Sequence, residues 1–282
     1  MHRTLALIAL WLALPVSTWA AGPPPASARS QIEASMLVTG DIDVTADGAV
    51  AAYRLDRPDA LPPEVLSLVE ETIAGWRFKP VRVDGVPASV STRASIRVRA
   101  KKIDEHRYFM GIAGARFSGR TGSGIRPRQP LAAPHYPPHL VDLGVGGTVY
   151  VVVRIAADGS VADVLAERVD LTTLGNDIQM QRMRDGLERA ALAVAKTWSF
   201  APPTGPDNAP PWLARVPVEF IPPGRTATAY GEWHAFVPGP QHDNPWPDLI
   251  DDGDPSTLVA GNAYRLGAPG PELLTPLGAS TD

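Results

Sequence analysis

The sequence predicts an α+β fold made of two successive β-β-α-β modules, each an antiparallel sheet with one packed helix. Three features recur in the same order in both halves of the chain: a hairpin with an Asp-Gly turn, an amphipathic helix and a Trp-x-Phe-x-Pro signature. A repeat of whole motifs at wide spacing is typical of a duplicated supersecondary unit. We therefore expect one module at residues 35–100 and a second at residues 134–222.

Signature residues occupy matching places in the two copies. The first copy has Asp47, Gly48, Trp76, Phe78 and Pro80, and the second has Asp158, Gly159, Trp198, Phe200 and Pro202. An Asp-Gly pair readily adopts the positive φ angles of a tight hairpin turn. The tryptophan and phenylalanine rings are expected to clamp the end of each helix onto its sheet, because they bury large apolar areas.

Apolar periodicity places the strands and helices between these markers. Valines alternate with other residues along 147–155, as in a strand. Apolar residues three and four apart run from Met180 to Trp198, and from Val65 to Trp76 in the first copy. At that spacing Met180 and Met183 are predicted to pack in the core rather than to hold a metal or cofactor.

Each module is expected to end in a closing strand, at 90–99 and at 212–220. In the first of these, Arg93, Arg97 and Arg99 share one face, which we interpret as a solvated basic stripe. In the second, Pro217 has no N–H group for the ladder, so this strand is predicted to lie at a sheet edge.

The remaining segments are predicted to be less regular. Residues 101–133 are rich in glycine, arginine and polar residues, which favours a linker. Residues 223–282 are dense in Pro, Gly and Asp, which favours an irregular tail that wraps the second module through Trp233, Phe236 and Trp246.

The N-terminus predicts export. A basic start, an apolar run from Leu5 to Leu14 and small residues near Ala20 are typical of a secretory signal peptide at residues 1–20. The chain has no cysteine, and export without disulfides favours the bacterial periplasm. The alternative is an uncleaved segment that anchors the protein in the inner membrane.

Composition and motifs argue against several function classes. A net charge of −4 gives no general attraction to nucleic acid or anionic lipid. The chain lacks a phosphate loop and a nucleophile elbow. His135 and His139 are separated by Pro137 and Pro138, so a shared helical face for a metal is not expected. We expect no enzyme activity, no cofactor and no metal.

The second copy resembles the C-terminal domain of TonB, the energy transducer of Gram-negative bacteria. The similarity rests on Tyr136-Pro137, a Gly-x-Val at Gly147, Asp158-Gly159-Ser-Val, Trp198-x-Phe-x-Pro and the run Val216 to Phe220. Residues 35–100 resemble the same domain without the Tyr-Pro. The resemblance implies a protein that binds an extended segment of an outer-membrane transporter by adding it to a sheet edge.

Carried over by position, the docking edge is the second closing strand, and Tyr136 lies near the bound peptide. The residues that the resemblance places on this edge are Ala214, Arg215, Val216, Val218 and Phe220. In the competing interpretation Val216, Val218 and Phe220 are core residues, and Tyr136-Pro137 is a structural turn.

Two roles remain open at this point. One is a partner in energy-dependent transport across the envelope. The other is a soluble periplasmic interaction or scaffold protein without energy coupling, which the cleavable signal and the short stretch before the first module favour. An exposed edge can also pair two chains, which makes a homodimer a further option.

Overall fold

The computed structural model describes residues 29–83, 85–103, 108–119, 124–203, 209–242, 245–246, 253–267 and 270–277. The predicted signal peptide at residues 1–20 lies outside these ranges. Over the described residues the fold is α+β, with mainly antiparallel sheets and few helices, as the sequence predicts.

The N-terminal half is organised around a long central strand. Its elements are β1 (Glu33–Val44), β2 (Val50–Leu55), η1 (Pro58–Ala60), α2 (Pro63–Ala74), β3 (Arg82–Val83), β4 (Val86–Pro87), β5 (Val90–Lys102) and β6 (Tyr108–Gly119). β1 pairs along its length with β5, and β5 pairs in turn with β6. We call this the N-terminal sheet.

The C-terminal half contains the second large sheet. Its elements are β7 (Arg126–Pro127), α3 (Pro138–Asp142), β8 (Gly147–Ile155), β9 (Val161–Leu171), α4 (Asp177–Ala195), β10 (Phe200–Ala201), β11 (Trp212–Phe220), β12 (His234–Phe236), η2 (Pro255–Thr257) and β13 (Tyr264–Arg265). The strand order of this C-terminal sheet is β13-β11-β8-β9.

Helix α4 has clear local causes. The Asn176 side chain accepts a hydrogen bond from the backbone of Gln179 at 2.9 Å, and the Gln179 side chain accepts one from the backbone of Asn176 at 2.9 Å. This capping box satisfies two N–H groups at the helix start. Met180 and Met183 are buried in the core with Leu187, which confirms their predicted packing role.

The Asp-Gly turn and the aromatic signature contact each other in the same way in both halves. Phe78 N–H donates to Gly48 O at 2.7 Å, and Phe200 N–H donates to Gly159 O at 2.8 Å. Both glycines have φ near +90°, at +89° and +86°, and a Cβ would lie within about 2 Å of the phenylalanine carbonyl oxygen. The two motifs of the repeat are therefore one structural unit, in which only glycine fits.

Substituting one of these glycines tests that unit. Gly159→Ala is expected to lower the free energy of unfolding by about 1–3 kcal/mol, because a strained φ is combined with a steric clash. Gly144→Ala is the matched control: Gly144 also has a positive φ, of +61°, but a Cβ there meets nothing within 4 Å. Urea unfolding of both variants gives the comparison. Equal losses would show that the contact with Phe200 is unimportant.

The aromatic rings of both signatures are buried, as predicted. Trp76 and Phe78 lie in the core beneath α2, and Trp198 and Phe200 lie in the core beneath α4. The prolines that complete the signatures, Pro80 and Pro202, are exposed.

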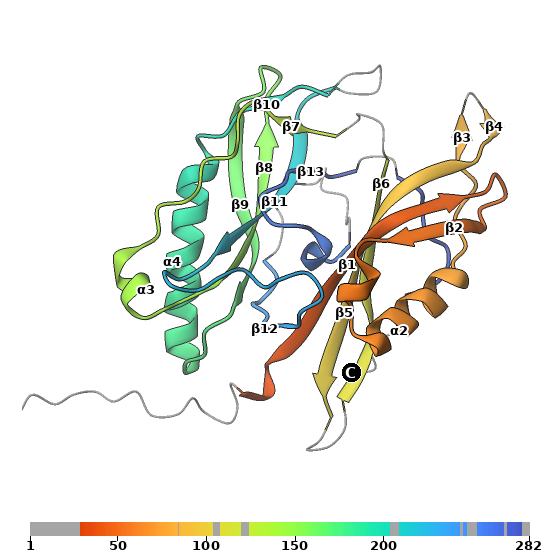
Figure 1. The fold of residues 1–282 in the computed structure, drawn as a ribbon. Helices are drawn as coiled ribbons and strands as arrows, with labels where there is room; N and C mark the ends of the chain where they lie inside the picture. The colour runs from red at the N-terminus through yellow and green to blue at the C-terminus, as the bar shows by residue number, and fades with distance from the viewer. Residues whose placement is uncertain are drawn as a thin grey trace, which may run out of the picture.

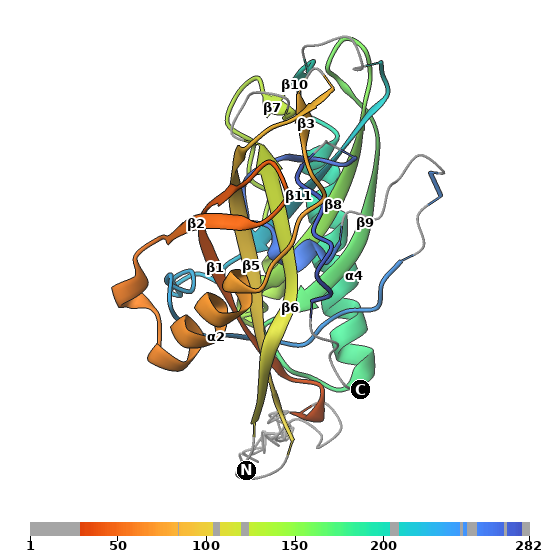
Figure 2. The ribbon, with the colours of Figure 1, turned by 90° about the vertical axis from the view of Figure 1, so that its right-hand side faces the viewer.

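The segment predicted as a linker contains a strand. β6 pairs with β5 along eleven register positions, so the N-terminal sheet extends into residues 108–119 (Figure 2). A β-bulge at Ala113, opposite the step from Arg97 to Val98, shifts the alternation of β6 by one residue. Ile112 and Phe117 therefore both reach the core, although their spacing does not fit period two. That interruption and the glycines explain why the pattern resembles a linker.

The two sheets face each other, and their helices lie on the outer sides. In Figure 1, α4 covers the C-terminal sheet on one flank and α2 covers the N-terminal sheet on the other. The tail runs between them: β12 pairs with β1, and β13 pairs with β11. The prediction that the tail wraps the second module is therefore correct in part. Trp246 packs against Val152 and Leu213 of that module, whereas Trp233 packs against the N-terminal core.

The predicted solvated stripe is also corrected. Arg99 contacts Asp254 of the tail at 2.9 Å, and Asp254 contacts Arg168 of the C-terminal sheet at 3.2 Å. Arg97 and Arg99 are thus turned toward the other sheet and the tail, whereas Arg93 pairs with Asp56 of the N-terminal half and stays partly exposed. A bridging carboxylate between two arginines ties the sheets together.

Candidate functional site

The predicted docking edge, β11, is paired on both sides. Its inner side pairs with β8 along all nine residues. On its outer side Leu266 N–H donates to Leu213 O at 2.9 Å, and Gly261 N–H donates to Pro217 O at 3.0 Å. Alternate residues of an antiparallel strand face opposite neighbours, so the odd-numbered residues of β11 face outward. Pro217 lies where its missing N–H interrupts no bond to β8. The prediction that β11 is an edge strand is nevertheless corrected, because β13 lies outside it and pairs with it at two positions.

The side chains predicted to contact a peptide lie inside the protein. Those of Ala214, Val216, Val218 and Phe220 belong to the core beneath α4. They are core residues, as the competing interpretation held, and the prediction that they face a partner is corrected. The physical reason is the pleat, which turns every even residue of β11 toward α4.

Arg215, also predicted on the docking edge, forms a buried ion pair. Its Nε lies 2.6 Å from Glu167 Oε2 and its Nη2 lies 2.8 Å from Glu167 Oε1. The side chain is 1% exposed and Glu167 is 6% exposed. Gln241 of the tail donates to the same carboxylate at 2.9 Å. The charge of Arg215 is therefore satisfied within the chain.

Tyr136 supports the same region from outside the sheet. Its hydroxyl donates to Val145 O, and its ring stands edge-on to Phe220 with centroids 5.4 Å apart. Burial raises the pKa of the Tyr136 phenol. These contacts give Tyr136 a structural role in the described chain.

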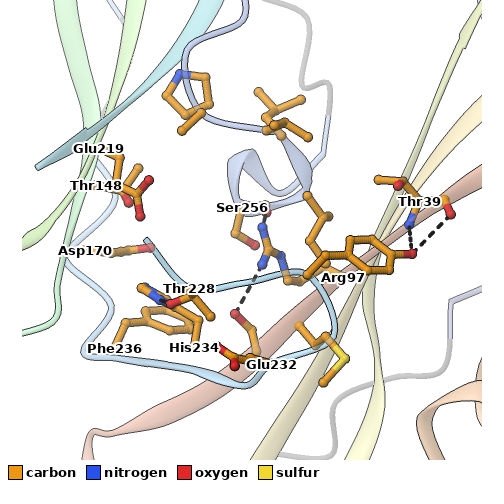
Figure 3. Close-up of a pocket in the computed structure, with 18 of the residues that line it drawn as sticks. Thr39, Arg97, Thr148, Asp170, Glu219, Thr228, Glu232, His234, Phe236 and Ser256 are labelled. Atoms are coloured by element: carbon orange, nitrogen blue, oxygen red, sulfur yellow. Dashed lines mark hydrogen bonds between the residues drawn. The ribbon is translucent and has the colours of Figure 1, made fainter. Parts of the chain in front are cut away.

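A cavity of about 350 Å³ lies between the two sheets. β1 and β5 form one wall, β8, β9 and β11 form the other, and tail residues 228–236 and 256–260 complete it. Figure 3 shows Arg97 reaching inward from the N-terminal sheet, with Glu219, Thr148 and Asp170 on the opposite wall. This volume is within the range of small-molecule sites.

Two charged residues that line this cavity, Arg97 and Glu219, were not predicted from the sequence to share a site. Arg97 Nη2 donates to Ser256 O, and Nη1 lies 3.4 Å from Ser35 Oγ. Burial lowers the pKa of the Arg97 guanidinium, and burial raises the pKa of the Glu219 carboxyl. They stand 122 positions apart in the chain, and no local pattern connects them.

The described ranges contain neither a candidate metal cluster nor a helix that could cross a membrane. No group of three or more His, Asp or Glu side chains there is placed to hold a metal ion. Every helix in the described part of the chain is too short or too polar to span a lipid bilayer.

Comparison with family models, with curated proteins and with solved structures finds no match to this chain.

Proposed function

We propose that this chain is a non-enzymatic, TonB C-terminal-like envelope protein with two modules, which binds an extended segment of a partner by strand addition at β11. The observation that carries the proposal is that the tail already adds a strand there. β13 lies antiparallel to β11, with Ala214 opposite Arg265 and Arg215 opposite Tyr264. The outer side of β11 therefore has the geometry that an incoming strand needs.

The strand in place is short. β13 pairs with β11 at two register positions, whereas β8 pairs with it at nine. Outside these two positions, the bonds to Leu213 O and Pro217 O hold the tail against the edge. A longer partner segment can form these bonds and reach the backbone of Glu219 as well. We propose that it displaces β13, which acts as a placeholder that protects the edge.

Backbone groups would supply most of the affinity in this mode. The even side chains of β11 are in the core, and Arg215 is engaged with Glu167. Backbone hydrogen bonds depend little on the partner's sequence. Specificity would therefore come from contacts between the partner's side chains and the tail residues next to β11. By the resemblance, the partner is the periplasmic segment of an outer-membrane transporter, and the process is energy-dependent transport.

A reversible lock on β13 tests the displacement. Ala214 and Arg265 form a non-hydrogen-bonded pair, because Leu213 on one side of Ala214 bonds to the tail. In such pairs the side chains are close enough for a cross-strand disulfide, and the chain contains no other cysteine. The variant Ala214→Cys/Arg265→Cys is expected to bind N-terminal transporter peptides when reduced, and at least about ten-fold more weakly when oxidised.

The readout is an NMR titration of one sample before and after reduction, with the wild-type protein under both conditions as control. Shifts of backbone resonances confined to β11 and β13 are the expected result. Equal binding by the oxidised and reduced variant would overturn displacement. If no transporter peptide shifts resonances of the wild-type protein, strand addition at this edge is wrong.

A further inference from the structure

Arg97 differs from several other arginines near the interface of the two sheets. Arg99, Arg168 and Arg215 each contact a carboxylate oxygen, for example at 2.9 Å between Arg99 and Asp254. Among the described residues, Arg97 has only Ser35 Oγ and the Ser256 carbonyl as partners, and its buried Nε–H has none. Asp254 and Asp170 attract the charge of Arg97 without contacting it. A buried guanidinium that contacts no carboxylate is costly.

Glu219 shows the complementary pattern on the opposite wall. The other carboxylates that line the cavity are engaged: Asp170 contacts Arg168 at 3.0 Å, and Glu232 accepts from Ala229 N at 3.2 Å. Over the described part of the chain, the side chain of Glu219 has no hydrogen bond and no ion pair, although the residue is partly buried. Burial raises its pKa with no opposing contact, so its charged form is left unstabilised.

The cavity thus places an unpaired cation and an unpaired anion on facing walls. Ser256, which is 3% exposed, adds a hydroxyl whose Oγ has no partner among the described residues. Met36 and Phe236 supply apolar lining between the polar groups. Charged groups held apart across a small cavity are a binding arrangement, because each gains a partner only from a molecule that fills the space.

We infer that this cavity is a binding site for a small zwitterion of amino-acid type, whose carboxylate pairs with Arg97 and whose ammonium group pairs with Glu219. A simple anion fits less well, since Glu219 and Asp170 would repel it from the opposite wall. A simple cation also fits less well, because Arg97 would repel it. The site exists only where both sheets and the tail come together, and it does not depend on strand addition at β11.

The length of the ligand is measured with a series of ω-amino acids. Isothermal titration of the protein with 4-aminobutyrate, 6-aminohexanoate and 8-aminooctanoate is expected to show a best length. Hexanoate and hexylamine, which each lack one charge, are expected to bind at least about ten-fold more weakly than the best zwitterion, because each loses the hydrogen bonds to one charged group. Equal binding of hexanoate or hexylamine would overturn the inference.

Two substitutions assign the ends of the ligand. Glu219→Gln is expected to weaken the best ω-amino acid at least about ten-fold and to leave hexanoate unchanged or bound more tightly. Arg97→Gln is expected to weaken both molecules. Far-UV circular dichroism and thermal unfolding establish that each variant is folded. If Arg97→Gln does not fold, Glu219→Gln alone decides, because its loss must be specific to the ammonium-bearing probe.

Absence of heat and of resonance shifts with every ω-amino acid for the wild-type protein would also overturn the inference. The transporter-peptide titration remains unaffected by that outcome, because it uses a different ligand and is read by comparing the oxidised and the reduced Ala214→Cys/Arg265→Cys variant. Failure of the cavity site and failure of strand addition are therefore distinguishable.

Discussion

Arg215→Met is expected to lower the free energy of unfolding by about 3–5 kcal/mol. The substitution keeps an unbranched stem that ends near the position of Nε, but it removes the guanidinium and leaves Glu167 buried without its bidentate partner. An unpaired buried carboxylate is far more costly than a missing pair, so the loss comes from Glu167 rather than from the removed charge. Urea unfolding followed by tryptophan fluorescence measures it.

The double variant Arg215→Met/Glu167→Leu is the control for this interpretation. Removing both charges and keeping apolar volume is expected to recover most of the stability. A single variant as stable as wild type would mean that the pair is solvated. The experiment also separates two roles for Arg215, because a residue that served only to contact a peptide would change binding without changing stability.

Trp76→Ala is expected to lower the free energy of unfolding by about 3–5 kcal/mol. The side chain is 1% exposed, and its ring stands edge-on to Phe78 and to Phe117, with centroids 6.3 Å and 5.3 Å apart. Removing it leaves a large cavity beneath α2. Tyr53→Ala is the matched control: Tyr53 is 38% exposed on β2, and its loss is expected to cost less than about 1 kcal/mol.

A double-mutant cycle with Phe117→Ala extends this test to β6. Because the Trp76 and Phe117 rings contact each other, the cycle is expected to give a coupling of about 0.5–1.5 kcal/mol. Residues 108–119 would show no coupling to Trp76 if they formed a loose linker. The cycle therefore measures whether β6 belongs to the stable N-terminal sheet.

The resemblance to TonB remains the basis of the proposed function, and the paired edge changes how that function would operate. In an unprotected sheet a partner meets open backbone groups. Here the tail occupies part of that edge through β13, so binding would require an exchange of one strand for another. An edge protected in this way also resists pairing between two copies of the chain, which disfavours a homodimer through β11.

The sequence by itself determined the features that depend on local physics. Alternation, helical stripes and the Asp-Gly turns predicted the main strands and both long helices, because these signals are set by neighbours a few residues apart. Burial of Trp76 and Trp198 could be predicted because their rings are large and apolar.

Tertiary structure decided what depends on distant residues. A bulge at Ala113 concealed β6 by shifting its alternation, and Arg97 and Arg99, which the local pattern assigns to solvent, are turned toward the opposite sheet and the tail. Exposure of an edge depends on whether another segment pairs with it, and β13 comes from a tail with no strand pattern of its own. The cavity joins Arg97 to Glu219 only because the two sheets pack face to face, an arrangement that periodicity along the chain does not encode.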